Sequence, residues 1–129
     1  MTDSQVAVTP FQALGGWDGI DRLVEAFYAH VEEDTVLRPV YPENLEPGKL
    51  HLKLFLEEWL GGEPKYSSQF GHPRLRMRHF PFKVTPQGTG RWLRNMRLAM
   101  QECGVEEALA RQIFEAMAPL ARHMINAEE

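Results

Sequence analysis

Start and stop signals for helices divide this chain into segments whose apolar residues recur every three or four positions. A capping threonine followed directly by a proline occurs twice, at Thr9–Pro10 and Thr85–Pro86, and this pair favours the first turn of a helix. No stretch between turns alternates apolar and polar residues with a period of two, which is the pattern of a strand. The sequence therefore predicts an all-α protein.

The expected helices differ in length, and so do the connections between them. Asp18 is the expected cap of the second helix, and paired glycines end the first and third helices. Three prolines make residues 34–47 a turn-rich connection, and residues 62–71 have the polar composition of a loop. Such unequal parts are not typical of a regular up-and-down bundle. The segments expected to be helical are residues 10–14, 18–31, 47–60, 73–79, 86–103 and 105–126.

Size and composition favour a single domain. The chain has 129 residues, of which 43% are hydrophobic and 25% are charged, so a compact fold buries roughly two thirds of the surface of the unfolded chain. We expect residues 1–129 to form one domain, with residues 1–9 as a flexible N-terminal extension and residues 127–129 as a flexible tail.

Charge and hydropathy argue against several classes of protein. The formal net charge is −4, whereas a protein that binds nucleic acid needs a basic face. No apolar run approaches the roughly 20 residues of a membrane span, and the first ten residues lack the pattern of a signal peptide. Cys103 is the single cysteine, which excludes an internal disulfide. We therefore expect a cytoplasmic protein that does not bind nucleic acid.

One histidine, His79, ends a short arginine-rich segment that is bracketed by Pro73 and Pro81. Between these prolines there is room for about two helical turns, with His79 in the last of them. The neighbouring arginines favour the neutral imidazole, which keeps a nitrogen lone pair free for a metal. A lone histidine near a helix end is also often a surface or capping group, so this alternative stays open.

The residues around His79 narrow the choice of metal. No Cys, Asp or Glu lies between Tyr66 and Val84, whereas a bare zinc or iron ion needs at least three ligands from the protein. A metal complex that brings its own equatorial ligands needs only one ligand from the protein. Haem is such a complex, and its carboxylates are suitable partners for arginine and histidine donors.

The segment Gly71–Phe82, preceded by Trp59–Gly62 and followed by Trp92, resembles the truncated haemoglobins of group II, the bacterial O-type globins. The resemblance extends over residues 11–126. It implies a truncated globin fold, in which two helices pack over two in a sandwich that encloses one haem b per chain. It also implies that His79 is the proximal ligand of the haem iron.

The same resemblance assigns residues to the opposite, distal side of the haem. It places Tyr28, Tyr41 and Trp92 there as hydrogen-bond donors, although core packing is the ordinary role of such side chains. Three donors near bound dioxygen stabilise its partial negative charge, which predicts tight binding and slow release. Gly48 takes the position at which many globins carry a distal histidine, and Leu52 faces the ligand one turn later.

Further residues are expected to contact the haem or its propionates. For each charged or polar member of this set, a solvated surface position is an equally open interpretation. The set comprises Phe55, Tyr66, His72, Arg76, Arg78 and His51.

Three functions are consistent with these residues. The first is reversible binding of dioxygen, as in oxygen transport, and also of carbon monoxide and nitric oxide, at an iron held by His79. The second is a redox enzyme on the same scaffold, which oxidises nitric oxide or reduces peroxide and depends on an external reductase. The third is a helical interaction module without a cofactor. The resemblance also suggests a homodimer.

Overall fold

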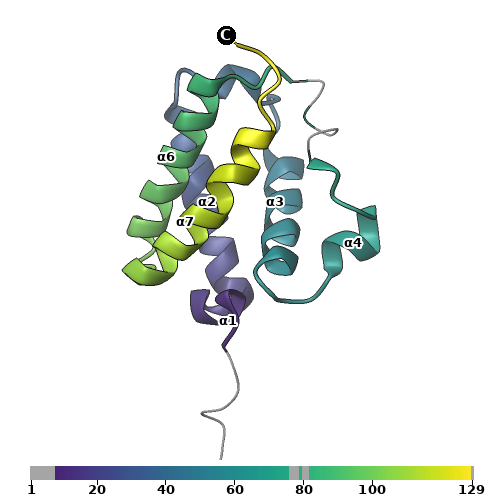
Figure 1. Ribbon diagram of the computed structural model, residues 1–129, viewed down its shortest axis with the longest axis vertical. Coiled ribbons are helices and arrows are strands. Elements are labelled where there is room, and N and C mark those ends of the chain that lie inside the picture. Colours follow the sequence, from purple (N-terminus) through teal and green to yellow (C-terminus); the bar gives the residue numbers. More distant parts are fainter. Residues whose placement is uncertain (1–7, 76–78, 80–81, 129) are drawn as a thin grey trace, which may run out of the picture.

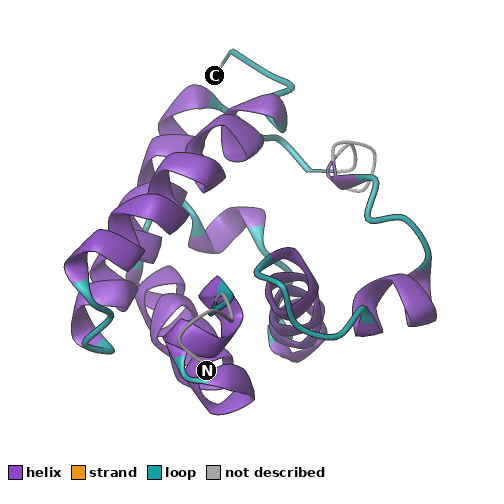
Figure 2. Cartoon of the chain, turned by 60° about the horizontal axis from the view of Figure 1, so that its bottom comes forward, coloured by secondary structure: helices purple, strands orange, loops and turns teal. Residues whose placement is uncertain are grey.

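The computed structural model describes residues 8–75, 79 and 82–128. Figure 2 shows helices and loops, with no strand in this part of the chain, so the prediction of an all-α fold is confirmed. Among the described helices, none combines the length and the hydropathy of a membrane-spanning segment. In chain order, the elements are α1 (Pro10–Leu14), α2 (Gly16–Glu33), the 3₁₀ helix η2 (Arg38–Val40), α3 (Glu46–Trp59), α4 (Lys65–Phe70), α6 (Pro86–Glu102) and α7 (Glu107–His123).

The four long helices form two pairs. α2 packs against α3, α6 packs against α7, and α2 also contacts α6 across the two pairs. Figure 1 shows α6 and α7 on one side of the view and α3 with the short α4 on the other. This is the two-over-two sandwich that the family resemblance implies. Its core includes the fully buried Phe27 of α2 and Met96 and Met100 of α6.

Two predicted helix caps are present. The Thr9 hydroxyl accepts a hydrogen bond from the Gln12 nitrogen at 3.1 Å, as half of a reciprocal capping box at the start of α1. The Thr85 hydroxyl accepts one from the Gly88 nitrogen at 2.9 Å at the start of α6. Each bond satisfies an amide that the first helical turn leaves without a partner. Residues 1–7 and 129 lie outside the described part, so the flexibility of the two ends stays a prediction.

The start of α2 differs from the prediction. α2 begins at Gly16, directly after Gly15, which ends α1 in a left-handed conformation with φ 109°. Only glycine adopts this conformation readily, and it turns the chain from one helix straight into the next. Asp18 therefore lies within the first turn instead of capping it, where its carboxylate is favourable beside the positive end of the helix dipole.

Two larger differences from the prediction concern α4 and the end of α7. The expected loop over residues 62–71 contains α4, whose Tyr66 side chain is buried. The Ser67 nitrogen donates to the Glu58 carboxylate of α3 at 2.9 Å, so contacts with α3 stabilise a short helix that its own sequence does not indicate. α7 ends at His123 and not at Asn126, whose nitrogen bonds to the Val84 carbonyl at 2.9 Å instead of continuing the helix.

A buried carboxylate, that of Asp34, joins the end of α2 to α6. Its Oδ1 accepts hydrogen bonds from the Val36 and Leu37 nitrogens at 2.9 and 3.1 Å. Its Oδ2 accepts from Arg91 Nε at 3.1 Å and from Asn95 Nδ2 at 2.9 Å. Burial raises the pKa of this carboxyl, but the bonds from Asn95, Arg91 and the Leu37 and Val36 amides together outweigh the burial and hold the pKa at about 2.

Acid should weaken the fold through Asp34. Its folded pKa of about 2 lies below the ordinary value of 3.8, so the charged group stabilises the fold above about pH 4, and this contribution is lost as the pH falls through 2. We expect Asp34→Asn to lower the free energy of unfolding by on the order of 2 kcal/mol more at pH 6 than at pH 2.

Urea unfolding of the two proteins at several pH values measures this difference. Glu106→Gln is the control, because it alters an exposed carboxylate that caps α7 by bonds to the Ala108 and Leu109 nitrogens. A destabilisation by Asp34→Asn that stays constant on acidification would contradict the prediction.

Candidate functional site

Four aromatic side chains from α2, the segment after η2, and α6 meet in one cluster. The Phe27 ring lies edge-on to the rings of Tyr28 and Trp92, at centroid distances of 5.4 and 5.0 Å. The Tyr28 and Tyr41 rings are also edge to face, 5.8 Å apart. We call these four residues the aromatic cluster. It brings together the three side chains that the family resemblance assigns to the distal side of a haem.

Both phenols of the aromatic cluster stay protonated at neutral pH. Burial raises the pKa of Tyr28 to about 12. Burial also raises the pKa of Tyr41, and the nearby Tyr28 adds to this rise, while a hydrogen bond from Trp92 opposes it. Each hydroxyl therefore keeps a proton that it can donate to a polar ligand.

Gly48, near the start of α3, leaves room for the Tyr28 hydroxyl. A Cβ atom at position 48 would lie 2.9 Å from that hydroxyl oxygen, which is closer than Cβ atoms come to their neighbours in a packed interior. Leu52 and Phe55 follow on the same face of α3, one and two turns later, and both pack against the core. This face of α3 therefore extends from the aromatic cluster to Phe55.

The ring of His79 is oriented by a main-chain hydrogen bond. Its Nδ1 lies 2.7 Å from the carbonyl oxygen of Leu75. A carbonyl oxygen only accepts, so Nδ1 carries the hydrogen and the neutral ring has its lone pair on Nε2. Metal-binding histidines use this arrangement, because the donated bond fixes the tautomer. Leu75 and His79 are both helical, and residues 76–78 between them lie outside the described part.

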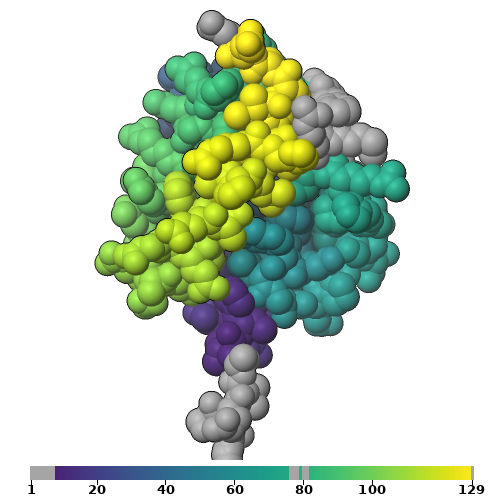
Figure 3. Space-filling view, in the orientation of Figure 1, coloured from purple at the N-terminus to yellow at the C-terminus, as the bar shows by residue number. Residues whose placement is uncertain are grey.

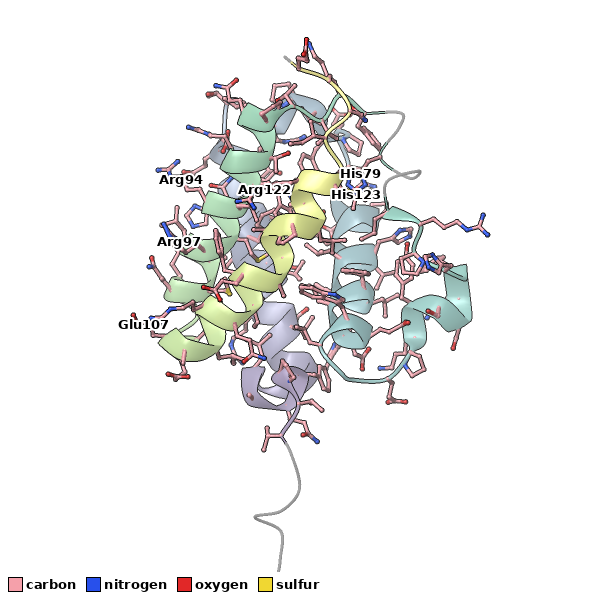
Figure 4. All side chains as sticks on the ribbon, viewed as in Figure 1. His79, Arg94, Arg97, Glu107, Arg122 and His123 are labelled. Atoms are coloured by element: carbon pink, nitrogen blue, oxygen red, sulfur yellow. The ribbon has the colours of Figure 1, made fainter. Side chains whose placement is uncertain are left out.

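Asn126, just beyond α7, holds the backbone on the C-terminal side of His79. Its Nδ2 donates to the carbonyls of Phe82 at 3.0 Å and of His79 at 3.3 Å. Its Oδ1 accepts from the Val84 nitrogen at 2.9 Å. Figure 4 shows His79 beside the end of α7, near the label of His123. The position of His79 therefore depends on contacts with the chain beyond α7.

A cavity of about 380 Å³ lies between α3, α7 and the segment that leads to His79. Figure 3 shows α7 across this face, next to the surface of α3 and α4. The wall of the cavity is mostly apolar, with basic side chains among the lining residues. One of these, His72, accepts a bond from the Arg74 nitrogen on Nδ1 at 3.0 Å, so its neutral ring has an N–H at Nε2. The described lining comprises Phe55, Trp59, His72, Pro73, Arg74, Leu75, Leu120, His123 and Met124.

These residues fit a haem. A haem is a flat apolar ring with two carboxylates and with axial positions open at its iron, and a volume of this size is typical of ligand pockets. The apolar wall suits the ring, the basic side chains suit the carboxylates, and His79 offers a nitrogen ligand. Among the described residues, no three His, Cys, Asp or Glu side chains gather as ligands for a bare metal ion.

The structure separates the residues predicted to contact the haem or its propionates. Phe55 and His72 line the cavity. His51 and Tyr66 instead face each other between α3 and α4, with ring centroids 6.2 Å apart, because α4 turns the buried Tyr66 toward α3. Neither belongs to the described lining of the cavity. Outside the described residues lie Arg76 and Arg78.

Trp59, Arg74 and His123 line the cavity, although none of them is among the site residues predicted from the sequence. Trp59 follows Phe55 by one turn of α3, and the two rings stack at 6.0 Å. His123 follows Leu120 by three residues on α7. Helical periodicity in the sequence therefore could have identified Trp59 and His123 as neighbours of Phe55 and Leu120. Arg74 has a left-handed backbone with φ 44°, and no pattern in the sequence indicates its direction.

A two-over-two helical fold with a histidine near an apolar cavity defines a protein of the globin class. The family described as Bacterial-like globin matches residues 9–126, and the chain belongs to this family. Over 120 residues it is 37% identical to the group 2 truncated hemoglobin YjbI of Bacillus subtilis (strain 168), a match that covers 93% of this chain and 90% of that relative.

Solved structures agree with this assignment. The group II truncated hemoglobin of Bacillus anthracis matches with a TM-score of 0.94 and 38% identity, over 97% of this chain and 96% of that one. A truncated oxygen-avid haemoglobin of Bacillus subtilis matches with a TM-score of 0.88 and 36% identity, over 92% of this chain and 100% of that one. The resemblance to group II truncated haemoglobins is therefore confirmed.

Gly48→Ala should displace the Tyr28 hydroxyl. The new methyl group would lie 2.9 Å from the hydroxyl oxygen, and overpacking typically costs about 1–3 kcal/mol, which exceeds a gain in helix propensity of up to about 1 kcal/mol. We expect a lower free energy of unfolding in urea. In a Tyr28→Phe background, which lacks the oxygen, the same change should be neutral or stabilising. Equal effects in the two backgrounds would show that the contact is absent.

Proposed function

We propose that this chain is a haem protein that binds dioxygen reversibly, with His79 as its ligand to the iron. The observation that carries the proposal is the Nδ1 bond of His79 to Leu75, which leaves the Nε2 lone pair for a metal. Leu75 itself lines the apolar cavity. One bound haem b per chain supplies an iron at which dioxygen, carbon monoxide and nitric oxide bind.

We assign Tyr28, Tyr41 and Trp92 to the side of the haem opposite His79. Their grouping in the aromatic cluster and the raised pKa values of the two phenols support this role. A hydrogen bond to dioxygen in the site stabilises its partial negative charge, so release is slow. The oxygen-avid haemoglobin of Bacillus subtilis, 36% identical to this chain, is consistent with such tight binding.

Slow release favours chemistry at the site over bulk delivery of oxygen. The second candidate is therefore a redox enzyme that oxidises nitric oxide or reduces peroxide, with the hydroxyls of Tyr28 and Tyr41 as donors. Conversion of nitric oxide and dioxygen to nitrate takes up one electron per turnover, and we propose that an external reductase supplies it. We also propose that the protein is cytoplasmic and that it forms a homodimer.

His79→Gly should abolish normal haem binding. Wild-type protein incubated with haem should show an intense Soret band that shifts on reduction and on addition of carbon monoxide. The variant should lose this spectrum, and added imidazole should restore much of it, because the free base replaces the missing ligand. Absorption spectroscopy measures both effects.

The control for His79→Gly is His30→Ala, which removes a histidine paired with Glu102 at 2.9 Å, away from the cavity lining. It should keep the wild-type spectrum. Failure of correctly folded wild-type protein to take up haem would disprove the proposed function and favour a cofactor-free interaction module.

Tyr28→Phe and Trp92→Phe should each speed the release of dioxygen. A hydrogen bond contributes about 0.5–1.5 kcal/mol, which corresponds to roughly two- to tenfold in the dissociation rate. Stopped-flow displacement of dioxygen by carbon monoxide measures this rate. Tyr66→Phe, which alters a buried tyrosine outside the aromatic cluster, is the control. Unchanged rates in both variants would mean that neither side chain acts as a donor to the ligand.

A further inference from the structure

A buried hydrogen-bond network connects the two chain segments that carry Tyr41 and Trp92. We call it the Asp34 network, because the Asp34 carboxylate accepts every bond in it. No atom of this network belongs to the aromatic cluster, so its effect on the site passes through the backbone. The donors are the main-chain nitrogens of Val36 and Leu37 and the side chains of Arg91 and Asn95.

On α6, the donors of the Asp34 network lie on both sides of Trp92 in the sequence. Arg91 precedes Trp92 directly, and Asn95 follows it by three residues. Their bonds to Asp34 Oδ2, at 3.1 and 2.9 Å, are spaced by about one helical turn. Two such bonds to one atom restrict the rotation of α6 about its axis, and this rotation sets the direction in which the Trp92 indole projects.

On the other side, Asp34 begins the segment that leads to Tyr41. Its carboxylate binds two amides of this segment, and its carbonyl accepts from the Arg38 nitrogen at 2.8 Å. The Arg38 side chain then donates to the carbonyls of Pro42 and Glu43, both at 3.0 Å. The main chain is therefore held before and after Tyr41 by bonds that start from the end of α2.

A buried carboxylate is a costly way to join two segments. Its desolvation opposes folding, and well-packed apolar residues often stabilise a protein as much as a buried ion pair does. Directional bonds supply what apolar packing does not, which is a fixed relative orientation of the joined parts. In this chain the joined parts carry Tyr41 and Trp92, two members of the aromatic cluster.

We propose that Asp34 is a positioning residue of the ligand site: it fixes the Tyr41 hydroxyl relative to the Trp92 indole and thereby sets how fast the ligand leaves. The inference rests on the proposed function. It extends that function to a carboxylate that does not contact the ligand.

Two variants separate the two sides of the network. Asp34→Asn keeps one oxygen for the amides of Val36 and Leu37, but its NH₂ group faces the donors of α6. Asn95→Ala removes one bond between Asp34 and α6 and leaves the carboxylate in place. This second variant tests the network if Asp34→Asn does not fold. In haem-loaded protein, both should move the C–O stretch of the carbon monoxide adduct to higher wavenumber and raise the dioxygen dissociation rate roughly two- to tenfold.

Glu106→Gln is the matched control, because this carboxylate also caps main-chain amides but lies at the start of α7. It should leave the stretch and the rate unchanged. A second readout needs no haem: the indole N–H resonance of Trp92, identified by its absence in Trp92→Phe, should shift in the Asp34 and Asn95 variants of the haem-free protein.

The outcomes distinguish this inference from the proposed function. Wild-type values in both network variants would overturn the inference alone, provided that Tyr28→Phe or Trp92→Phe still changes the stretch and the rate. A wild-type protein that takes up no haem would overturn the proposed function and the inference together. A change in thermal stability without a change in the stretch or the indole resonance would mean that Asp34 is purely structural, and would also overturn the inference.

Discussion

The burial of α2 between α3 and α6 is the constraint on which the rest of the structure depends. Its apolar stripe from Ile20 to Val31 is almost completely buried, and both neighbouring helices pack against it. A helix covered on two sides cannot rotate without opening gaps in a close-packed interior. Since Phe27 and Tyr28 belong to this helix, the core of the protein locates these two members of the aromatic cluster.

Much of the fold was predictable because its signals are local. Thr9 and Thr85 cap helices where the sequence places them, and the apolar stripes identify the four long helices. The short α4 was not predictable, because its stability comes from contacts with α3. Tyr66 has to be buried and Ser67 has to reach Glu58, and a local pattern does not contain a partner that lies elsewhere in the chain.

Some residues of the candidate site could likewise be predicted from the local sequence, whereas others could not. His79 stands out in its own segment, and the family resemblance groups Tyr28 with Tyr41 and Trp92, whose rings the structure also brings together. His123 contributes to the cavity only because α7 crosses beside α3, and the course of a later helix is a property of the whole fold. The role of Asp34 could not be predicted either, since its partners on α6 follow it by about sixty residues.

The bonds between Asn126 and the backbone at His79 and Phe82 have a consequence for the order of events during synthesis. Between the histidine and its structural support lie the whole of α6 and the whole of α7. The histidine therefore leaves the ribosome well before the residue that holds its backbone, and the site cannot reach its final form until the segment that contains Asn126 has been synthesised. A cofactor that depends on the position of His79 would accordingly be captured only after α6 and α7 have emerged.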